Sequence, residues 1–260
     1  MSLVSGKSFQ LITLLLIWIV AIYYIFSKRE IWIRRLAALD FIDESVGRAA
    51  EMGRAVTCHG FGDYDTGLES SSSPAIFAGI AVLGHVARVC ARFGTPIYAT
   101  MRAGNVIPVA EEVLRTAYRL EGKLSEFEAK KEEMLPWVAT RQAHMALGFR
   151  VKPACNIMIG PFWNEAIQIA EVYGRVGAVQ IGGTASTTQI PFLAACMDMS
   201  LIGEEIYAIG AYIDKGRSTL ASLATTDLFK VILGVIVVLG VILATLGPSA
   251  VSPLINLFKW

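Results

Sequence analysis

Residues 155–186 read CNIMIGPFWNEAIQIAEVYGRVGAVQIGGTAS. A short apolar run, Cys155–Ile159, is followed by an amphipathic stretch, Asn164–Tyr173, and then by a second apolar run, Ala178–Ile181. This order is typical of a strand–helix–strand unit whose two strands are parallel. The stretch therefore predicts an α/β domain.

The same alternation continues on both sides of this unit. Further strands are expected at Ala55–Cys58, Pro96–Thr100 and Met199–Ile202. Helices are expected at Pro74–Arg92, Pro108–Glu121, Trp137–Leu147, Ile190–Cys196 and Glu204–Tyr212, and the charged stretch Lys123–Glu133 indicates a solvated helix or a linker. We therefore expect a Rossmann-like parallel sheet within residues 55–214.

The two ends of the chain are much more apolar than its middle. Hydrophobic residues make up 54% of the 260 residues and charged residues 17%, with a mean hydropathy of +0.54. Soluble domains are about 45–50% apolar and about 25% charged. Two runs, Phe9–Phe26 and Phe229–Leu246, hold much of the excess and have the length of a bilayer-spanning helix. They predict N-terminal and C-terminal transmembrane helices at residues 9–27 and 229–247.

A signal peptide is the alternative for the first run. The run ends in aromatic residues and leads directly into Lys28 and Arg29, without the small residues of a cleavage site. This pattern favours an uncleaved anchor.

The remaining segments follow from these two spans. Residues 1–8 are expected to form a short outer N-terminus, 28–54 a juxtamembrane amphipathic helix lying on lipid or on the domain, 215–228 a linker and 248–260 an interfacial tail. Basic residues next to the spans lie mainly on the side of the domain: Lys28, Arg29, Arg34, Arg35, Lys215, Arg217 and Lys230. The domain is therefore expected in the cytoplasm, with both termini outside the cell membrane.

The charge balance limits the classes of partner. Twenty-three Lys and Arg residues face 22 Asp and Glu residues, a formal net charge of +1. A nucleic-acid-binding domain normally carries a clear excess of positive charge, so no nucleic acid is expected as a partner.

Glycine or small polar residues follow each expected strand. In a doubly wound sheet, the loops after the strands meet at one edge, where ligands bind. Glycine lets backbone N–H groups approach a ligand, and hydroxyls can hold an anion. The expected ligand-binding residues are Gly182, Gly183, Thr184, Ser186 and Thr187, with Arg102 and Asn105 from the loop after the second strand. The alternative is that these glycines only serve tight turns.

This loop edge specifies no nucleotide, because it lacks the lysine of a P-loop and the spacing of a dinucleotide-binding fingerprint. We expect a small phosphorylated or acidic ligand there. A bulky residue at Gly183 should then abolish ligand binding and leave the fold intact.

No pattern of catalytic or metal-binding residues is evident. His59, His85 and His144 have no metal-site spacing, and His59 adjoins Cys58 on a strand, where neighbouring side chains point to opposite faces. The four cysteines lack a CxxC motif and are expected to be reduced, buried thiols. We therefore expect no metal, cofactor or catalytic residue, and an enzyme is not the favoured reading.

Three motifs carry a resemblance to a known family. They are NIMIG at residues 156–160, AEVYGRVGAVQIGGTAS at 170–186 and LIGEEIYAIGAY at 201–212. Together they resemble an uncharacterised family of membrane proteins of anaerobic bacteria and archaea, in which a domain of unknown function is followed directly by a transmembrane helix. The resemblance covers the chain from about Ala55 through the second span. It implies an α/β domain with membrane attachment, and no activity.

Two functions from different classes remain. The helices covering Ala75–Val89 and Ile190–Cys196 are more apolar than solvent-facing helices need to be, which favours a membrane-anchored scaffold that forms a homo-oligomer. Burial in a sheet that is covered on both sides would also explain the run Ala75–Val89. The alternative is a membrane-bound enzyme or sensor that binds a small anionic ligand at the loop edge. The expected partners are the lipid bilayer, further copies of the chain and that possible ligand.

Overall fold

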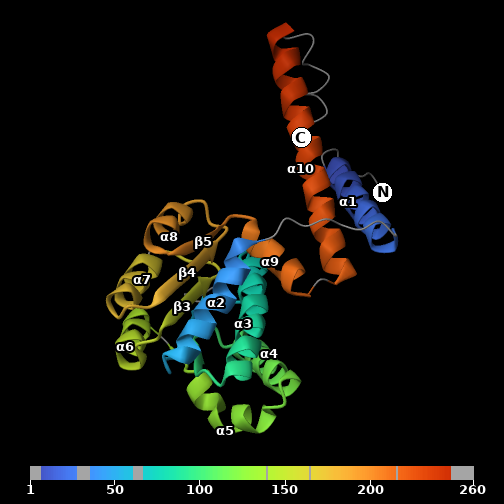
Figure 1. Cartoon of the computed structure of the whole chain (residues 1–260). Coiled ribbons are helices and arrows are strands. Elements are labelled where there is room, and N and C mark those ends of the chain that lie inside the picture. The colour runs from blue at the N-terminus through green and yellow to red at the C-terminus, as the bar shows by residue number, and fades with distance from the viewer. Residues whose placement is uncertain are drawn as a thin grey trace. The chain divides into compact units, whose positions relative to one another are not determined.

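The computed structural model describes residues 7–27, 36–60, 67–138, 140–163, 165–214 and 216–246 (Figure 1). The chain divides into two compact units, Arg34–Ile213 and the paired ends Met1–Ile33 and Asp214–Trp260. Most of the expected outer N-terminus, the start of the juxtamembrane segment and the whole interfacial tail lie outside the described residues.

The larger unit is built on a parallel sheet, as the sequence predicts. Its strands are β1 (Val56–His59), β2 (Ile97–Ala99), β3 (Cys155–Ile159), β4 (Val179–Thr184) and β5 (Met199–Ile202). They lie in the order β2-β1-β3-β4-β5, and every neighbouring pair is parallel. This is the flavodoxin-like doubly wound order rather than the dinucleotide-binding Rossmann order, and it reverses direction between β1 and β3.

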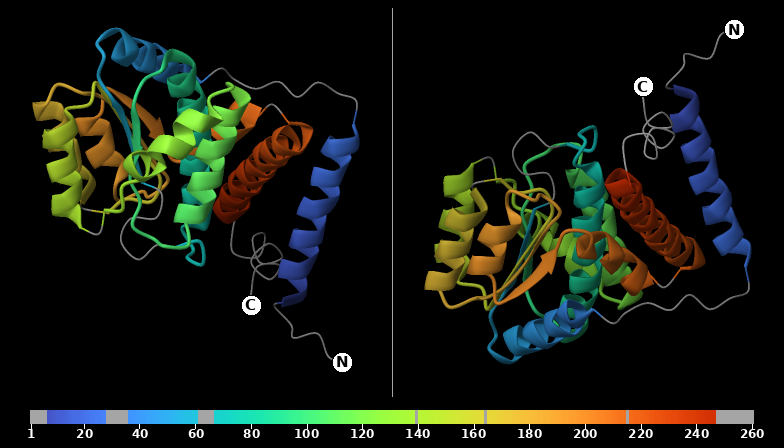
Figure 2. Two further views of the ribbon diagram at one scale, coloured as in Figure 1. Left: turned by 90° about the horizontal axis from the view of Figure 1, so that it is seen from below. Right: turned by 90° about the horizontal axis from the view of Figure 1, so that it is seen from above.

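Helices cover both faces of the sheet (Figures 1 and 2). α2 (Ala37–Glu51), α3 (Ser73–Phe93) and α9 (Glu205–Asp214) lie on one face, and α4 (Ile107–Leu120) and α5 (Leu124–Met134) continue outward from α3. α6 (Arg141–Val151), α7 (Glu165–Arg175) and α8 (Ile190–Cys196) lie on the other face. The charged stretch is thus helical, as one of its two interpretations predicts.

The two faces of the sheet differ in chemistry, because successive residues of a strand point to opposite sides. The apolar face carries Val56, Cys58 and Ile157 against α2 and α3. The polar face carries a row made of Thr57, Asn156 and Gln180, which are paired in register across β1, β3 and β4. This row is buried beneath α7 and α8.

The apolar run in α3 is a core element, which corrects the expectation that it forms a partner surface. Ile76, Leu83 and Val86 of this helix are fully buried, and α3 packs between α2, α4 and the sheet. A helix with apolar residues on most of its circumference is typical of such a central position. Most of the surplus of apolar residues in α3 is therefore satisfied within the domain, although Phe77 remains 53% exposed.

α2 resolves the two alternatives left for the juxtamembrane segment. Its apolar residues Ile42, Val46 and Ala49 are fully buried against the α/β unit. The amphipathic face of this helix thus packs on the domain and not on lipid.

α6 begins later than the sequence suggests. Thr140 is the N-cap, and its hydroxyl accepts a hydrogen bond from the Ala143 N–H at 3.2 Å. The preceding Trp137 forms a parallel bridge with Met101, just beyond the end of β2. Trp137 therefore belongs to the sheet edge, and Thr140 belongs to the helix cap.

The smaller unit is a pair of helices, α1 (Lys7–Phe26) and α10 (Arg217–Leu246), which pack against each other. Arg217 Nε donates a 2.9 Å hydrogen bond to the Ile25 carbonyl, so the end of α1 lies beside the start of α10 and the helices are antiparallel. Arg217–Thr245 reaches a mean hydropathy of 2.7 and is a candidate membrane span, and α1 contains the shorter apolar stretch Thr13–Phe26. Most of the expected linker 215–228 is helical, because α10 starts at Arg217.

Candidate functional site

The carboxyl ends of the five parallel strands lie at one edge of the sheet, where the ligand-binding residues were expected. The expected residues nevertheless belong to two separate groups. Arg102 and Asn105 follow β2, whereas Ser186 and Thr187 follow β4, and β1 and β3 lie between these strands. Three strand spacings correspond to about 14 Å. The strand ends therefore do not bring these residues into one small pocket.

The group after β2 contacts the loop after β1. A Cβ atom placed on Gly67 would lie 2.7 Å from Asn105 Nδ2, so the exposed Asn105 side chain packs directly on that glycine. Arg102 is half-buried, and its carbonyl accepts a 3.3 Å hydrogen bond from Trp137 Nε1. Asn105 thus connects the loops after β1 and β2, whereas the Arg102 carbonyl is bonded to the segment before α6.

The polar groups at the end of β4 mainly form hydrogen bonds with one another. Thr184 is buried, and its hydroxyl accepts a hydrogen bond from the Ser186 N–H at 3.3 Å. The Ser186 hydroxyl lies 3.0 Å from the Thr188 hydroxyl, and Thr187 is exposed. These hydroxyls mainly organise the start of α8.

Gly182 and Gly183 lie inside β4 and not in the loop after it, which corrects the expected end of this strand. A Cβ atom on Gly182 would lie 2.6 Å from Met197 Cγ, and one on Gly183 would lie 2.9 Å from Leu201 Cβ and 3.0 Å from Ile206 Cγ2. Glycine is thus needed for close packing on both faces. A bulky residue at Gly183 would disturb the fold, contrary to the expectation of an intact fold.

The point where the strand order reverses is filled by the protein. A Cβ atom on Gly160 would lie 2.0 Å from the Gly60 carbonyl oxygen, and one on Gly60 would lie 2.5 Å from Phe162 Cζ. Both glycines have a positive φ, and Phe162 is buried. The position that binds ligands in many doubly wound folds is here closed by backbone and an aromatic ring.

A buried hydrogen-bonded row crosses the polar face. Thr57 Oγ1 donates to Asn156 Oδ1 at 3.1 Å, Asn156 Nδ2 donates to Gln180 Oε1 at 3.4 Å, and Gln180 Nε2 donates to the Cys196 carbonyl at 3.3 Å. The row therefore connects β1, β3, β4 and α8. Buried polar groups need such partners to avoid a large desolvation cost.

His59 lies next to this row and is fully buried. Its Nδ1 is hydrogen-bonded to the Thr100 hydroxyl, and its ring centroid is 5.3 Å from that of His144 and 5.0 Å from that of Tyr173. Burial, and then the nearby His144, hold the pKa of His59 well below its usual value, and burial lowers the pKa of His144 to about 4. Both rings are neutral at pH 7.

Nε2 of His59 has no hydrogen-bond partner among the residues that the structure describes. This nitrogen would be a base, but the ring is sealed from solvent and from the loop edge. Cys58 points to the opposite, apolar face, and burial raises the pKa of its thiol. The arrangement makes direct activation of Cys58 by His59 impossible, and His59 has a structural role.

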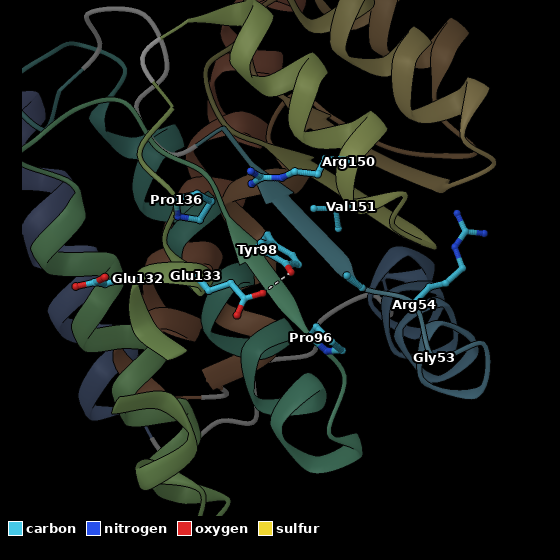
Figure 3. Close-up of a pocket in the computed structure, with 10 residues that line it drawn as sticks. Gly53, Arg54, Pro96, Tyr98, Glu132, Glu133, Pro136, Arg150 and Val151 are labelled. Carbon is cyan, nitrogen blue, oxygen red and sulfur yellow. Dashed lines mark hydrogen bonds between the residues drawn. The ribbon is translucent and has the colours of Figure 1, made fainter. Parts of the chain in front are cut away.

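A cavity of about 570 Å³ lies at the opposite edge of the sheet, at the amino ends of β1 and β2 (Figure 3). It is lined by Gly53, Arg54, Ala55, Pro96, Tyr98, Glu132, Glu133, Pro136, Arg150 and Val151. The sequence predicts that Glu132 and Glu133 belong to a solvated segment, and it predicts no ligand site at this edge of the sheet. Because the cavity forms only where α5 and α6 pack beside β2, no local sequence pattern predicts it.

Within the described ranges, no group of three or more His, Cys, Asp and Glu side chains could hold a metal ion. A family model described as "Domain of unknown function (DUF6754)" matches residues 2–255, which confirms the resemblance to an uncharacterised family. No curated protein and no solved structure matches the chain.

Proposed function

The chain belongs to the family described as a domain of unknown function (DUF6754), and from this premise we propose that it is a membrane-anchored scaffold protein that assembles as a homo-oligomer. The observation that carries the proposal is the pair α1 and α10. Large apolar side chains are exposed along both helices, among them Leu14 and Trp18 in α1 and Val231, Val237 and Val241 in α10.

A bilayer is the environment that suits this pair. A helix that is apolar around its whole circumference needs apolar surroundings, and the other described residues leave the most apolar stretch of α10 exposed. A helix of 30 residues is about 45 Å long, enough to cross a hydrocarbon core of about 30 Å. α1, with 20 residues, is about 30 Å long and also suffices.

The antiparallel arrangement supports one orientation. The end of α1 and the start of α10 lie together, so both connections to the α/β domain leave from the same end of the pair. Lys28, Arg29, Arg34 and Arg35 follow α1 in the sequence, and Arg217 opens α10. Such residues stay on the cytoplasmic side, which supports a cytoplasmic domain with both termini outside.

The proposed contact between copies lies at α8. Most apolar residues of α3 are buried, whereas α8 exposes much of its apolar surface: Phe192 is 47% exposed, and Ala194 and Ala195 are also exposed. Trp163, in the loop after β3, is 57% exposed. Aromatic side chains of this kind are enriched at the centre of protein interfaces. The filled reversal point between β1 and β3 favours a scaffold over an enzyme.

Membrane anchoring is tested by extracting membranes of expressing cells with alkaline carbonate. We expect the full chain to stay in the membrane pellet and to float with lipid in a density gradient. Release of the full chain into the soluble fraction would contradict the anchor.

Assembly is tested by measuring the mass of the full chain in mild detergent. We expect a multiple of the single-chain mass, and a lower mass for the double variant Phe192→Ser and Trp163→Ser. Leu120→Ser is the matched control, because Leu120 is 63% exposed but lies at the end of α4, away from α8. A monomeric wild type sinks the assembly proposal, and an unchanged mass of the double variant sinks its placement at α8.

The alternative, an enzyme or sensor for a phosphorylated or acidic molecule, retains one observation in its favour. Asn105 joins the loops after β1 and β2 at the expected edge, and Arg102 lies in the second of these loops. Calorimetric titration of the full chain with inorganic phosphate tests it, with Arg102→Gln as the variant. Binding by the wild type that is lost in the variant would favour this alternative.

A further inference from the structure

The cavity at the amino ends of β1 and β2 is independent of the membrane anchor and of the α8 surface. Its volume of about 570 Å³ falls within the range of about 300–1,000 Å³ that is usual for small-molecule sites. Pro96, Pro136 and Val151 give it apolar walls, and Tyr98 of β2 places a phenol among its lining residues. The cavity thus has the size and the mixed lining of a binding site.

One part of the cavity is acidic. Glu133 Oε1 accepts a 2.8 Å hydrogen bond from the Tyr98 hydroxyl, and Figure 3 shows Glu133 directed toward Tyr98, whereas Glu132 points away. Glu133 lies in the last turn of α5, where the helix dipole disfavours a carboxylate. In the part of the chain that is described, no cation forms an ion pair with Glu133. A cationic group in the cavity would remove this electrostatic conflict.

Another part of the cavity is basic. Arg150 lies in the last turn of α6 and forms no ion pair or side-chain hydrogen bond with another described residue. Its charge reaches the Tyr98 phenol: the pKa of Tyr98 is raised by burial first and then by Glu133, while Arg150 lowers it. Arg150, Tyr98 and Glu133 line the same cavity, so they can act on the same bound molecule.

Arg54 is the second guanidinium at this site, and it is fixed by the protein. Its Nε donates to the Lys152 carbonyl at 2.9 Å, and its Nη2 donates to the carbonyls of Pro153 at 2.8 Å and Val176 at 3.0 Å. Because Arg54 is held in this way, Arg150 is the guanidinium that is available for a carboxylate. A guanidinium binds a carboxylate through two parallel hydrogen bonds.

We propose that this cavity binds a small zwitterion of the amino-acid or dipeptide class, with its ammonium group at Glu133 and Tyr98 and its carboxylate at Arg150. The apolar walls formed by Pro96, Pro136 and Val151 receive the side chain. The ammonium group offsets the unfavourable position of Glu133 and can also lie against the Tyr98 ring. Both charges of the ligand are matched, so neither end alone suffices.

The probes are three forms of one dipeptide, titrated calorimetrically into the full chain in detergent. They are L-alanyl-L-leucine, its N-acetyl derivative, which lacks the ammonium group, and its C-terminal amide, which lacks the carboxylate. We expect the free dipeptide to bind and each blocked form to bind at least about tenfold more weakly, corresponding to about 1.4 kcal/mol.

Two variants assign the ends of the ligand. Glu133→Gln should weaken binding of the free dipeptide to the level of the N-acetyl form, and Arg150→Gln should weaken it to the level of the amide. Arg119→Gln is the matched control, because this arginine lies in the last turn of α4 and does not line the cavity. Thermal unfolding of each variant checks that the domain is intact.

Three outcomes overturn the proposal. The first is that the wild type binds no form of the dipeptide. The second is that the blocked forms bind as well as the free form, which would show that the cavity recognises neither charge of the dipeptide. The third is that both variants weaken all three probes equally, which would show a general change in the cavity and not recognition of two ends.

Discussion

α3 and α10 are both long, apolar helices, yet they have opposite surroundings. α3 reaches a mean hydropathy of 1.6 and is mostly buried among α2, α4 and the sheet. α10 reaches 2.7, and its apolar side chains are exposed. Length and hydropathy alone would assign both helices to a membrane. What separates them is whether the rest of the chain supplies their apolar surroundings.

The helices also differ in how closely other elements approach them. A Cβ atom on Gly84 of α3 would lie 3.0 Å from Val113 Cγ1 of α4, whereas a Cβ atom on Gly234 of α10 would meet no described atom within 4 Å. α3 is thus specified by contacts within the domain. The described residues give α10 no comparable contact at Gly234.

The largest expected effect is that of a charge placed in each helix. Leu83 in α3 is fully buried, so Leu83→Asp buries an unpaired carboxylate and should unfold the domain, with a loss of more than about 4 kcal/mol. Val237 in α10 is 63% exposed, so Val237→Asp should leave the unfolding of the domain unchanged. Thermal unfolding of the full chain in detergent, followed by circular dichroism, measures both.

Val237→Asp should instead act on insertion, since an aspartate at the centre of a span costs about 2.5–3.5 kcal/mol. The membrane-bound fraction of the variant therefore falls. If Val237→Asp unfolded the domain as Leu83→Asp does, α10 would be a core helix and the contrast would be lost.

The sequence alone predicts the parallel sheet, but it does not predict whether α3 is buried within the domain. Strands β3 and β5 lie where their apolar runs predict, because a short apolar run between turn residues usually forms a buried strand. β4 is longer than predicted, since Gly182 and Gly183 look like a loop until the helices packed on them are known. Hydropathy likewise cannot reveal which helices will cover α3.

The candidate sites were predicted only in part. The meeting of five loops at one edge follows from parallel strands, but the strand order that separates Arg102 from Ser186 is a tertiary property. The row Thr57, Asn156 and Gln180 also escaped prediction, because polar residues in a strand usually indicate a solvent-facing side. The cavity beside Tyr98 depends on α5 and α6, which are distant in sequence from β1.

A second contrast between the domain and the helix pair concerns pH. His144 has a folded pKa of about 4 against about 6.5 in the unfolded chain, so the unfolded state takes up a proton first as the pH falls. Stability is therefore complete above pH 6.5 and decreases between pH 6.5 and 4, by about 3 kcal/mol in total for this group. His59 shifts in the same direction and adds to the loss.

Denaturant unfolding of the full chain between pH 7 and 5, above the titration of most carboxylates, measures this loss. His144→Phe should reduce the slope by up to about 1.4 kcal/mol per pH unit. The packing of α1 against α10 should not change in this range. A slope that is the same in the variant and the wild type would show that His144 is not the titrating group.

The glycines provide a smaller and closely matched comparison. Gly84→Leu forces a side chain against Val113 and should destabilise the domain by about 1–3 kcal/mol. Gly234→Leu meets no described atom and should leave the unfolding of the domain unchanged. Equal effects in thermal unfolding would mean that close packing does not distinguish α3 from α10.

The smallest effect is expected where a single polar contact is removed from each helix. α3 is tied to α2 by His85 Nε2 and Asp43 Oδ1 at 2.7 Å, and α10 is tied to α1 by Arg217 Nε and the Ile25 carbonyl at 2.9 Å. Each such bond contributes about 1 kcal/mol. His85→Gln should leave α3 in place, because its packing on α2, α4 and the sheet holds it. Arg217→Gln should loosen the ends of α1 and α10, which spin labels at Phe26 and Leu220 would report as a broader distance distribution. An unchanged distribution would mean that packing alone fixes α10 on α1, as it fixes α3 in the domain.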